Sequence, residues 1–199
     1  MADKEPIRVV ICGKSEEVGR GIIAGLQPEV EGKPIHSMTH TVSQQLLLRR
    51  EILRTLSQGE NTDSPARASP TLVIHFGLSP AALAAELPAV LAGRAPASAS
   101  SGLGTGNYQE EEGGRPRRPR AVVFGGAWDG ADVETVRAAV RGCGGEGDGV
   151  VMLRHDGRKP SPPLGPAYGP HVVQRVKDVL GRLVRGEEVE WAGEGVVWY

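Results

Sequence analysis

The chain is poor in the residues that build disulfide frameworks, zinc clusters and membrane spans. Only two of its 199 residues are cysteine, Cys12 and Cys143, and neither belongs to a CxxC pair. This excludes a disulfide framework and a four-cysteine zinc site, and it favours a reducing compartment. No stretch approaches the roughly 18 uncharged apolar residues of a membrane helix, because the best candidate, 80–93, contains Glu86 and Pro88. We therefore expect a cytoplasmic protein that does not enter a membrane.

The chain also lacks an excess of charge of one sign. Its formal net charge is −1 and its pI is near 6.5, so no overall field would attract nucleic acid or anionic lipid. The basic run at 115–120 follows the acidic run at 110–112, which indicates a solvated segment. The charged residues 1–6 are not followed by the apolar region of a signal peptide. We expect no nucleic-acid partner.

What the chain does have is a repeated pattern of strand, glycine and helix start. Three short apolar runs rich in β-branched residues end at glycine, at 8–13, 72–77 and 121–126. Each run is continuously apolar, which is typical of a strand buried on both faces. A helix start follows each run, so the pattern predicts the strand–loop–helix unit of a parallel α/β sheet.

Capping residues and apolar spacing locate the helices. Ser15 is a good N-cap for a helix over 15–27, and Ser79 followed by Pro80 begins another that reaches about residue 92. Pro88 predicts a kink or a restart in that second helix. The remaining expected elements are a helix capped by Asp129 or Asp132 and ending near 141, a strand over 149–153, a helix over 170–185, and an edge strand or clasp over 195–199.

The chain is expected to form a single domain over 1–199 with two irregular segments. The segment at about 31–71 separates the first helix from the next strand, and two interpretations stay open. It is either an inserted surface helix or a sequence foreign to the fold, such as translated non-coding sequence. The segment at about 94–120 is rich first in Ala, Ser, Gly and Pro and then in charge, and this composition predicts a disordered linker.

Right-handed crossovers between four strands predict the sheet order 2-1-3-4, with the order reversing between strands 1 and 3. Ligands in such sheets lie at the carboxyl ends of the strands beside the reversal. The residues at that edge are our candidate ligand-binding residues: Gly13, Lys14, Ser15, Gly125, Gly126 and Trp128. Trp128 could stack on a flat ligand ring or cover the end of the sheet.

The glycines at this edge match known phosphate motifs only in part. A P-loop ending at Gly13-Lys14-Ser15 would need glycine at position 8, where the chain has Arg8. After Gly13 the next glycines are Gly19 and Gly21, so GxGxxG is reduced to a first glycine and one within the helix. The helix N-terminus offers free N–H groups to a phosphate, and the two glutamates of its first turn, at 16–17, oppose an anion there.

In its strand–glycine–helix layout the chain resembles a Rossmann-type NAD(P)-binding domain over about 8–30 and 72–153. The resemblance implies a three-layer Rossmann-like or flavodoxin-like fold, a nucleotide cofactor of the NAD(P) type and, if the protein is an enzyme, an oxidoreductase. None of the tyrosines has a lysine four residues later, so the Tyr-x-x-x-Lys pattern of short-chain dehydrogenases is absent. The second strand ends in His-Phe-Gly at 75–77, without the carboxylate that would bind the ribose of NAD. The alternative is a non-catalytic accessory or interaction protein on the same scaffold.

Three further residues carry weaker expectations. Cys12, beside a helix start, is either a stabilised thiolate or a buried structural cysteine. His155 and Asp156 could form an acid–base pair, although adjacent strand residues point to opposite faces. We expect no metal site. The expected partner class is a small-molecule or nucleotide ligand.

Overall fold

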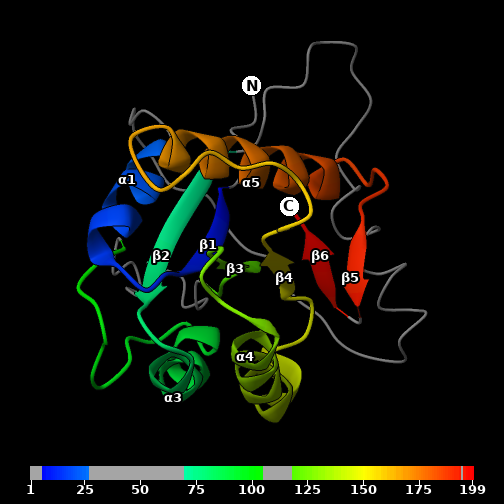
Figure 1. Ribbon diagram of the computed structural model, residues 1–199. Coiled ribbons are helices and arrows are strands. Elements are labelled where there is room, and N and C mark those ends of the chain that lie inside the picture. Colours follow the sequence, from blue (N-terminus) through cyan, green and yellow to red (C-terminus); the bar gives the residue numbers. More distant parts are fainter. Residues whose placement is uncertain (1–5, 27–69, 105–117, 194) are drawn as a thin grey trace, which may run out of the picture.

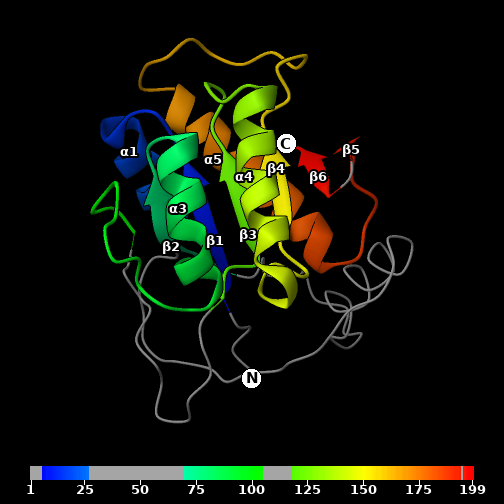
Figure 2. The same cartoon turned by 90° about the horizontal axis from the view of Figure 1, so that it is seen from below.

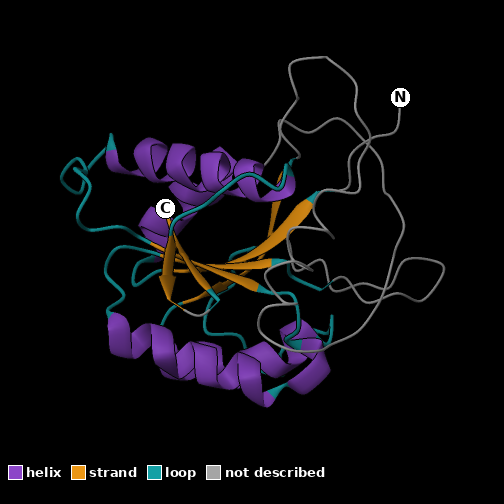
Figure 3. Ribbon diagram, turned by 90° about the vertical axis from the view of Figure 1, so that its right-hand side faces the viewer, coloured by secondary structure: helices purple, strands orange, loops and turns teal. Residues whose placement is uncertain are grey.

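The computed structural model of the protein describes residues 6–26, 70–104, 118–193 and 195–199. A six-stranded sheet of order β2-β1-β3-β4-β6-β5 lies between two layers of helices (Figures 1 and 3). The strands are β1 (Ile7–Cys12), β2 (Thr71–Gly77), β3 (Ala121–Phe124), β4 (Val151–Arg154), β5 (Trp191–Gly193) and β6 (Val196–Trp198). The helices are α1 (Glu16–Leu26), α3 (Pro80–Leu91), α4 (Gly130–Gly142), the short 3-10 helix η1 (Gly144–Glu146) and α5 (Tyr168–Val184).

The α/β class and the strand order 2-1-3-4 are confirmed, and the sheet continues beyond them. Strands β2, β1, β3, β4 and β6 pair in parallel, and only β5 runs antiparallel to its neighbour. The expected sheet of about four strands is therefore too small. The chain end predicted as an edge strand or clasp contains β6, which lies inside the sheet, and β5 is the strand at that edge.

Each face of the sheet has its own apolar core, because buried strand residues alternate between the faces. Helices α1 and α5 cover one face, where Val9, Ile11 and Phe76 pack against the apolar stripe of α5. Helices α3 and α4 cover the other, where Val10, Cys12 and their neighbours lie; Figure 2 shows these two helices in front of the sheet. The fold is a three-layer sandwich with its loops at the two sheet ends.

Two predicted boundaries shift by about two residues for local reasons. Strand β4 begins at Val151 and not at Gly149, because Gly149 has a left-handed φ of 77° and Val150 N–H donates to the Gly147 carbonyl in a turn. Helix α5 begins at Tyr168, two residues before the predicted start at Pro170. Proline is tolerated throughout a first helical turn, since the N–H groups there have no helical partner.

Helix α3 begins as predicted and continues through its internal proline. Ser79 is the N-cap, its hydroxyl accepts from Ala82 N–H at 3.2 Å, and Pro80 is the first helical residue. Pro88 lies inside the helix, which runs without a break to Leu91. The expected restart at Pro88 is absent.

Part of the predicted disordered linker is packed against the domain. Residues 94–104 are described, and Ser101 is buried with its hydroxyl donating to Glu16 of α1 at 2.7 Å. Ser100 N–H donates to the buried carboxylate of Glu86 at 2.5 Å. The described part of the segment predicted as a linker thus makes polar contacts with α1 and α3. Residues 105–117 lie outside the described part.

The packed segment passes beside β2, the outermost strand on its side of the sheet. Gly104 adopts a left-handed φ of 109°, and a side chain there would meet the backbone of β2, 2.8 Å from Ile74 O and 2.9 Å from His75 N. Residues 100–104 thus cross from the α3 layer to the α1 layer along β2. Most of the predicted insertion at 31–71 lies outside the described residues, while Thr71 itself begins β2.

Candidate functional site at the carboxyl edge of the sheet

The parallel strands bring most of the predicted site residues to one edge. Cys12 pairs with Phe124, and Phe124 pairs with Arg154, so the loops that follow β1, β3 and β4 are neighbours. Gly125 N–H donates to Cys12 O at 2.8 Å. A side chain on Gly125 would come within 3.9 Å of Gly13 Cα. The expected juxtaposition of Gly13 with Gly125 is therefore present.

The glycines of the β1–α1 loop make room for a side chain of the protein itself. A Cβ on Gly13 would lie 2.7 Å from Phe76 Cζ, and one on Gly19 would lie 2.6 Å from both Phe76 Cζ and Cε2. Phe76 is fully buried, so the surrounding core restricts any shift of its ring. Packing of the β2 phenylalanine is thus a sufficient reason for glycine at both positions.

Acidic groups occupy the N-terminus of α1, where a phosphate would be bound in a dinucleotide site. Ser15 accepts from Val18 N–H at 3.5 Å, and Glu16 and Glu17 form the first turn. Glu16 accepts from Ser101 on one side and from Arg20, at 3.1 Å, on the other. Two carboxylates at a helix N-terminus interact favourably with the helix dipole, and their negative charge disfavours an anionic ligand there.

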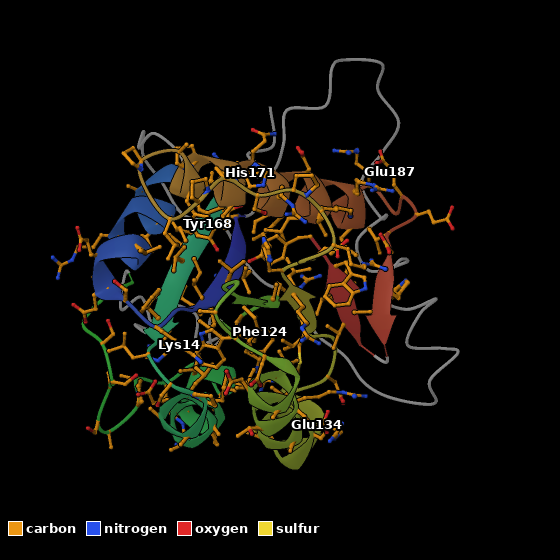
Figure 4. All side chains as sticks on the ribbon, in the orientation of Figure 1. Lys14, Phe124, Glu134, Tyr168, His171 and Glu187 are labelled. Carbon is orange, nitrogen blue, oxygen red and sulfur yellow. The ribbon has the colours of Figure 1, made fainter. Side chains whose placement is uncertain are left out.

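Lys14 is engaged by the neighbouring helix. Its Nζ lies 3.1 Å from Asp132 Oδ2, and the Lys14 side chain is 50% exposed. Asp132 also accepts from Asp129 N–H, while Asp129 accepts from Asp132 N–H, which completes a capping box at the start of α4. Asp129 is thus the N-cap, and Lys14 crosses the reversal point of the sheet from β1 to α4. Figure 4 shows Lys14 at that edge.

Trp128 covers the end of the sheet and has no free ring face for a ligand. Its side chain is 4% exposed and belongs to the core beneath the sheet, with its ring centroid 5.7 Å from that of Phe124. This burial favours the interpretation in which Trp128 covers the end of the sheet. The sequence contains a local signal for this burial. Trp128 immediately precedes the N-cap and Val133 is the fourth helical residue, which is the spacing of a hydrophobic staple.

A second set of polar side chains converges after β4, and sequence reasoning identified only one of them. His155 Nε2 lies 3.1 Å from Ser161 Oγ and 3.4 Å from Arg175 Nη1. Arg175 Nη1 lies 3.3 Å from the same Ser161 oxygen. We call His155, Ser161 and Arg175 the β4 cluster. They come from a strand end, a proline-rich loop and helix α5.

Gly126 lies directly against this cluster. A Cβ built there would lie 2.9 Å from Tyr168 Oη and 3.3 Å from His155 Nδ1. Tyr168 is the first residue of α5 and is labelled in Figure 4. Glycine at 126 therefore lets the Tyr168 hydroxyl and the His155 ring pack directly against the β3 loop.

Tyr199 contacts two members of the β4 cluster, Arg175 and His155. The Arg175 guanidinium donates to the carbonyl oxygen of Tyr199 and lies over the Tyr199 ring, 5.7 Å from its centroid. The His155 ring meets the same tyrosine edge-on, with centroids 5.6 Å apart. Tyr199 is 2% exposed and its hydroxyl donates to Phe124 O at 2.7 Å. Burial raises the pKa of the Tyr199 phenol well above its usual range.

His155 and Asp156 do not form a pair. Partial burial, followed by the Arg175 charge, lowers the pKa of His155 from its usual value. Its Nε2 lies within hydrogen-bond distance of both Ser161 Oγ and Arg175 Nη1. The buried Asp156 carboxylate instead accepts from Arg158 at 2.8 Å and lies 3.3 Å from Lys159, and the Arg158 hydrogen bonds hold the pKa of Asp156 far below its usual range.

Other possible sites carry less chemistry. A groove of about 740 Å³ lies between α3 and residues 94–100 and is lined mainly by alanine and proline, with none of the six predicted site residues. Cys12 is buried, and desolvation raises its thiol pKa, which agrees with the structural interpretation. Among the described residues no group of three metal-ligating side chains gathers. None of the helices in the described ranges has the length and hydropathy needed to cross a bilayer.

Comparison with known proteins finds a similarity to one curated protein. The chain is 27% identical over 186 residues to "Kojic acid related protein 6" of Aspergillus oryzae (strain ATCC 42149 / RIB 40), and the alignment covers 92% of this chain and 82% of that protein. No family model matches the chain. No solved structure matches it either. The chain is thus similar to one curated fungal protein over nearly its whole length.

Proposed function

We propose that this protein is a Rossmann-like domain that binds a small ligand with an anionic group at the carboxyl ends of β3 and β4. The observation that carries the proposal is the β4 cluster, in which a hydroxyl, an imidazole and a guanidinium lie within 3.1 to 3.4 Å of one another. Guanidinium and hydroxyl donors in this arrangement suit a phosphate or carboxylate.

Gly126 completes this site. Tyr168 Oη and His155 Nδ1 pack against its backbone, and these two groups would contact the part of the ligand attached to the anionic group. The phosphate would then lie near β4 and not at the start of α1, where Glu16 and Glu17 stand. A nucleotide of the NAD(P) type remains our first candidate because the strand–glycine–helix scaffold resembles domains that bind it. An oxidoreductase activity would follow from that resemblance alone.

A thermal-shift screen tests the proposal. The ligands are NAD(H), NADP(H), FMN, ATP, S-adenosylmethionine and, because of the name of the fungal relative, kojic acid. A ligand present at 100 times its Kd should raise the free energy of unfolding by about 2.7 kcal/mol. No response to any of them would overturn the nucleotide-type ligand.

Matched glycine variants test the location. Gly126→Ala would place a methyl group 2.9 Å from Tyr168 Oη and should abolish the response, whereas a side chain on Gly157 would meet nothing within 4 Å. Gly157→Ala should therefore leave the response intact. If a ligand stabilises both variants equally, it binds elsewhere.

The second candidate, an accessory or interaction protein without a cofactor, has its own observation. Phe76 occupies the space beside Gly13 and Gly19, so the loop that binds pyrophosphate in Rossmann domains is filled by the protein's own core. This candidate predicts no thermal shift with any ligand in the screen.

A further inference from the structure

Ser161 lies in a loop with the properties of a protein-kinase substrate. The loop over 155–167 joins β4 to α5, and residues 160–163, Pro-Ser-Pro-Pro, have no regular secondary structure. Six of the seven residues over 158–164 are exposed, the exception being Pro162. Leu164 is 78% exposed. A kinase could therefore bind this segment as an extended strand without unfolding the domain.

The residues around Ser161 narrow the class of kinase. Pro162 follows the serine directly, and Arg158 lies three residues before it. Proline after the acceptor is the feature that proline-directed serine/threonine kinases select. The chain contains a second described Ser-Pro pair at Ser79-Pro80, but the Ser79 hydroxyl caps α3 and accepts from Ala82 N–H at 3.2 Å. That pair is an internal control.

The side chains that face the Ser161 hydroxyl are those that bind phosphoserine. Arg175 Nη1 lies 3.3 Å and His155 Nε2 lies 3.1 Å from Ser161 Oγ. The nearest buried carboxylate, Asp156, is already neutralised by Arg158 and Lys159. A phosphate adds up to two negative charges and three acceptor oxygens, which an arginine can bind in a charge-assisted contact.

We propose that Ser161 is phosphorylated by a proline-directed kinase and that its phosphate then binds Arg175 and His155, occupying the anion position of the candidate site. In the transfer, the Ser161 oxygen forms a bond to the γ-phosphorus of ATP while the bond to the β-phosphate oxygen breaks. ADP leaves with that electron pair, and the serine proton passes to the catalytic carboxylate of the kinase. The bound phosphate ties the 155–167 loop to α5. The part of the proposal in which phosphorylation excludes a ligand rests on the proposed function; the modification does not.

The first experiment measures the acceptor. The full-length protein and a peptide of residues 155–167 are incubated with ATP and a mitogen-activated protein kinase, and phosphate is located by peptide mapping. We expect phosphate at Ser161 in both and none at Ser79, and Pro162→Ala should abolish labelling at Ser161. A labelled peptide beside an unlabelled Ser161 in the folded protein would overturn the proposal, as would an unlabelled peptide.

The second experiment measures the docking of the phosphate. Phosphoserine is incorporated during synthesis at position 161 and, as a matched control, at the exposed Ser98, and each is titrated by phosphorus NMR. The charge of Arg175 should lower the titration midpoint at 161 by about 1 pH unit relative to 98. Equal midpoints would refute the docking even if the kinase modifies Ser161.

A third measurement separates regulation from modification. If the screen finds a ligand, phosphoserine at 161 should weaken its binding at least tenfold, while phosphoserine at 98 should not. Unchanged affinity would overturn the exclusion of the ligand and leave the phosphorylation site standing. The first two experiments use no ligand, so a failure of the proposed function does not affect them.

Discussion

Replacing Gly19 with alanine separates packing from ligand binding as the reason for the glycines after β1. Alanine normally stabilises the interior of a helix by about 1 kcal/mol relative to glycine. At Gly19 the new methyl group would lie 2.6 Å from two atoms of the Phe76 ring and 3.3 Å from Leu103 Cδ1. Overpacking of a closed core costs about 1 to 3 kcal/mol. We therefore expect Gly19→Ala to lower the free energy of unfolding by up to about 2 kcal/mol.

Gly21 is the matched control, two residues further along the same helix. A side chain there would meet nothing within 4 Å, so Gly21→Ala should raise the stability by about 0.5 to 1 kcal/mol. Urea unfolding at pH 7 measures both variants, with an unchanged m-value showing that the compactness of the states is preserved. Opposite signs for two alanines in one helix are the expected result.

A double-mutant cycle identifies the partner. Phe76→Leu replaces the ring that meets Gly19 with a smaller side chain. The double variant should be more stable, by about 1 kcal/mol or more, than the sum of the two single-variant losses predicts. If Gly19→Ala stabilises the protein as much as Gly21→Ala does, the packing argument fails. The glycine would then need a functional explanation such as close approach of a ligand.

Three further results are expected. Glu86→Ala leaves His75, whose Nε2 lies 2.6 Å from the Glu86 carboxylate, without this buried partner and should cost about 3 kcal/mol by urea unfolding; a loss typical of a surface site would contradict this. Tyr199→Phe removes the hydroxyl that donates to Phe124 O at 2.7 Å and should cost about 1 to 2 kcal/mol, so an unchanged thermal midpoint would argue against that bond. The lowered pKa of Asp156 predicts a contribution that is complete above the unfolded-state value of about 4 and is lost as the pH falls below it towards the folded-state value. Asp156→Asn should flatten the acid side of the stability curve, and a curve of unchanged shape would refute the assignment.

The fold was predictable where its cause is local. Continuous apolar runs indicated β1, β2 and β3 nearly to the residue, and Ser79 and Asp129 marked the helix starts because each caps its helix with its own side chain. The extra strands were harder to predict. β5 has three residues and contains a glycine, so its own sequence carries little strand signal. Its antiparallel partner is β6, which in turn pairs with β4.

For the site, only the arrangement of the backbone could be predicted from the sequence. Parallel pairing brings Gly13 to Gly125 by geometry, which the strand pattern already implied. Ser161, Tyr168 and Arg175 reach His155 from a loop and a helix that follow later in the chain, and no spacing rule relates them. For Trp128 the position at the sheet edge left two interpretations open, and its place before an N-cap was the local signal for the buried one.

The segment of residues 100–104 also lies where another molecule could pair with the edge of β2. An outermost strand with a run such as 72–76, Leu-Val-Ile-His-Phe, has the composition that templates cross-β assembly when its edge is open. Gly104 presses its own backbone against that strand at Ile74 and His75, where a second molecule would have to pair. Loosening the two serine anchors should therefore show itself first as aggregation at high protein concentration, before any loss of the folded core.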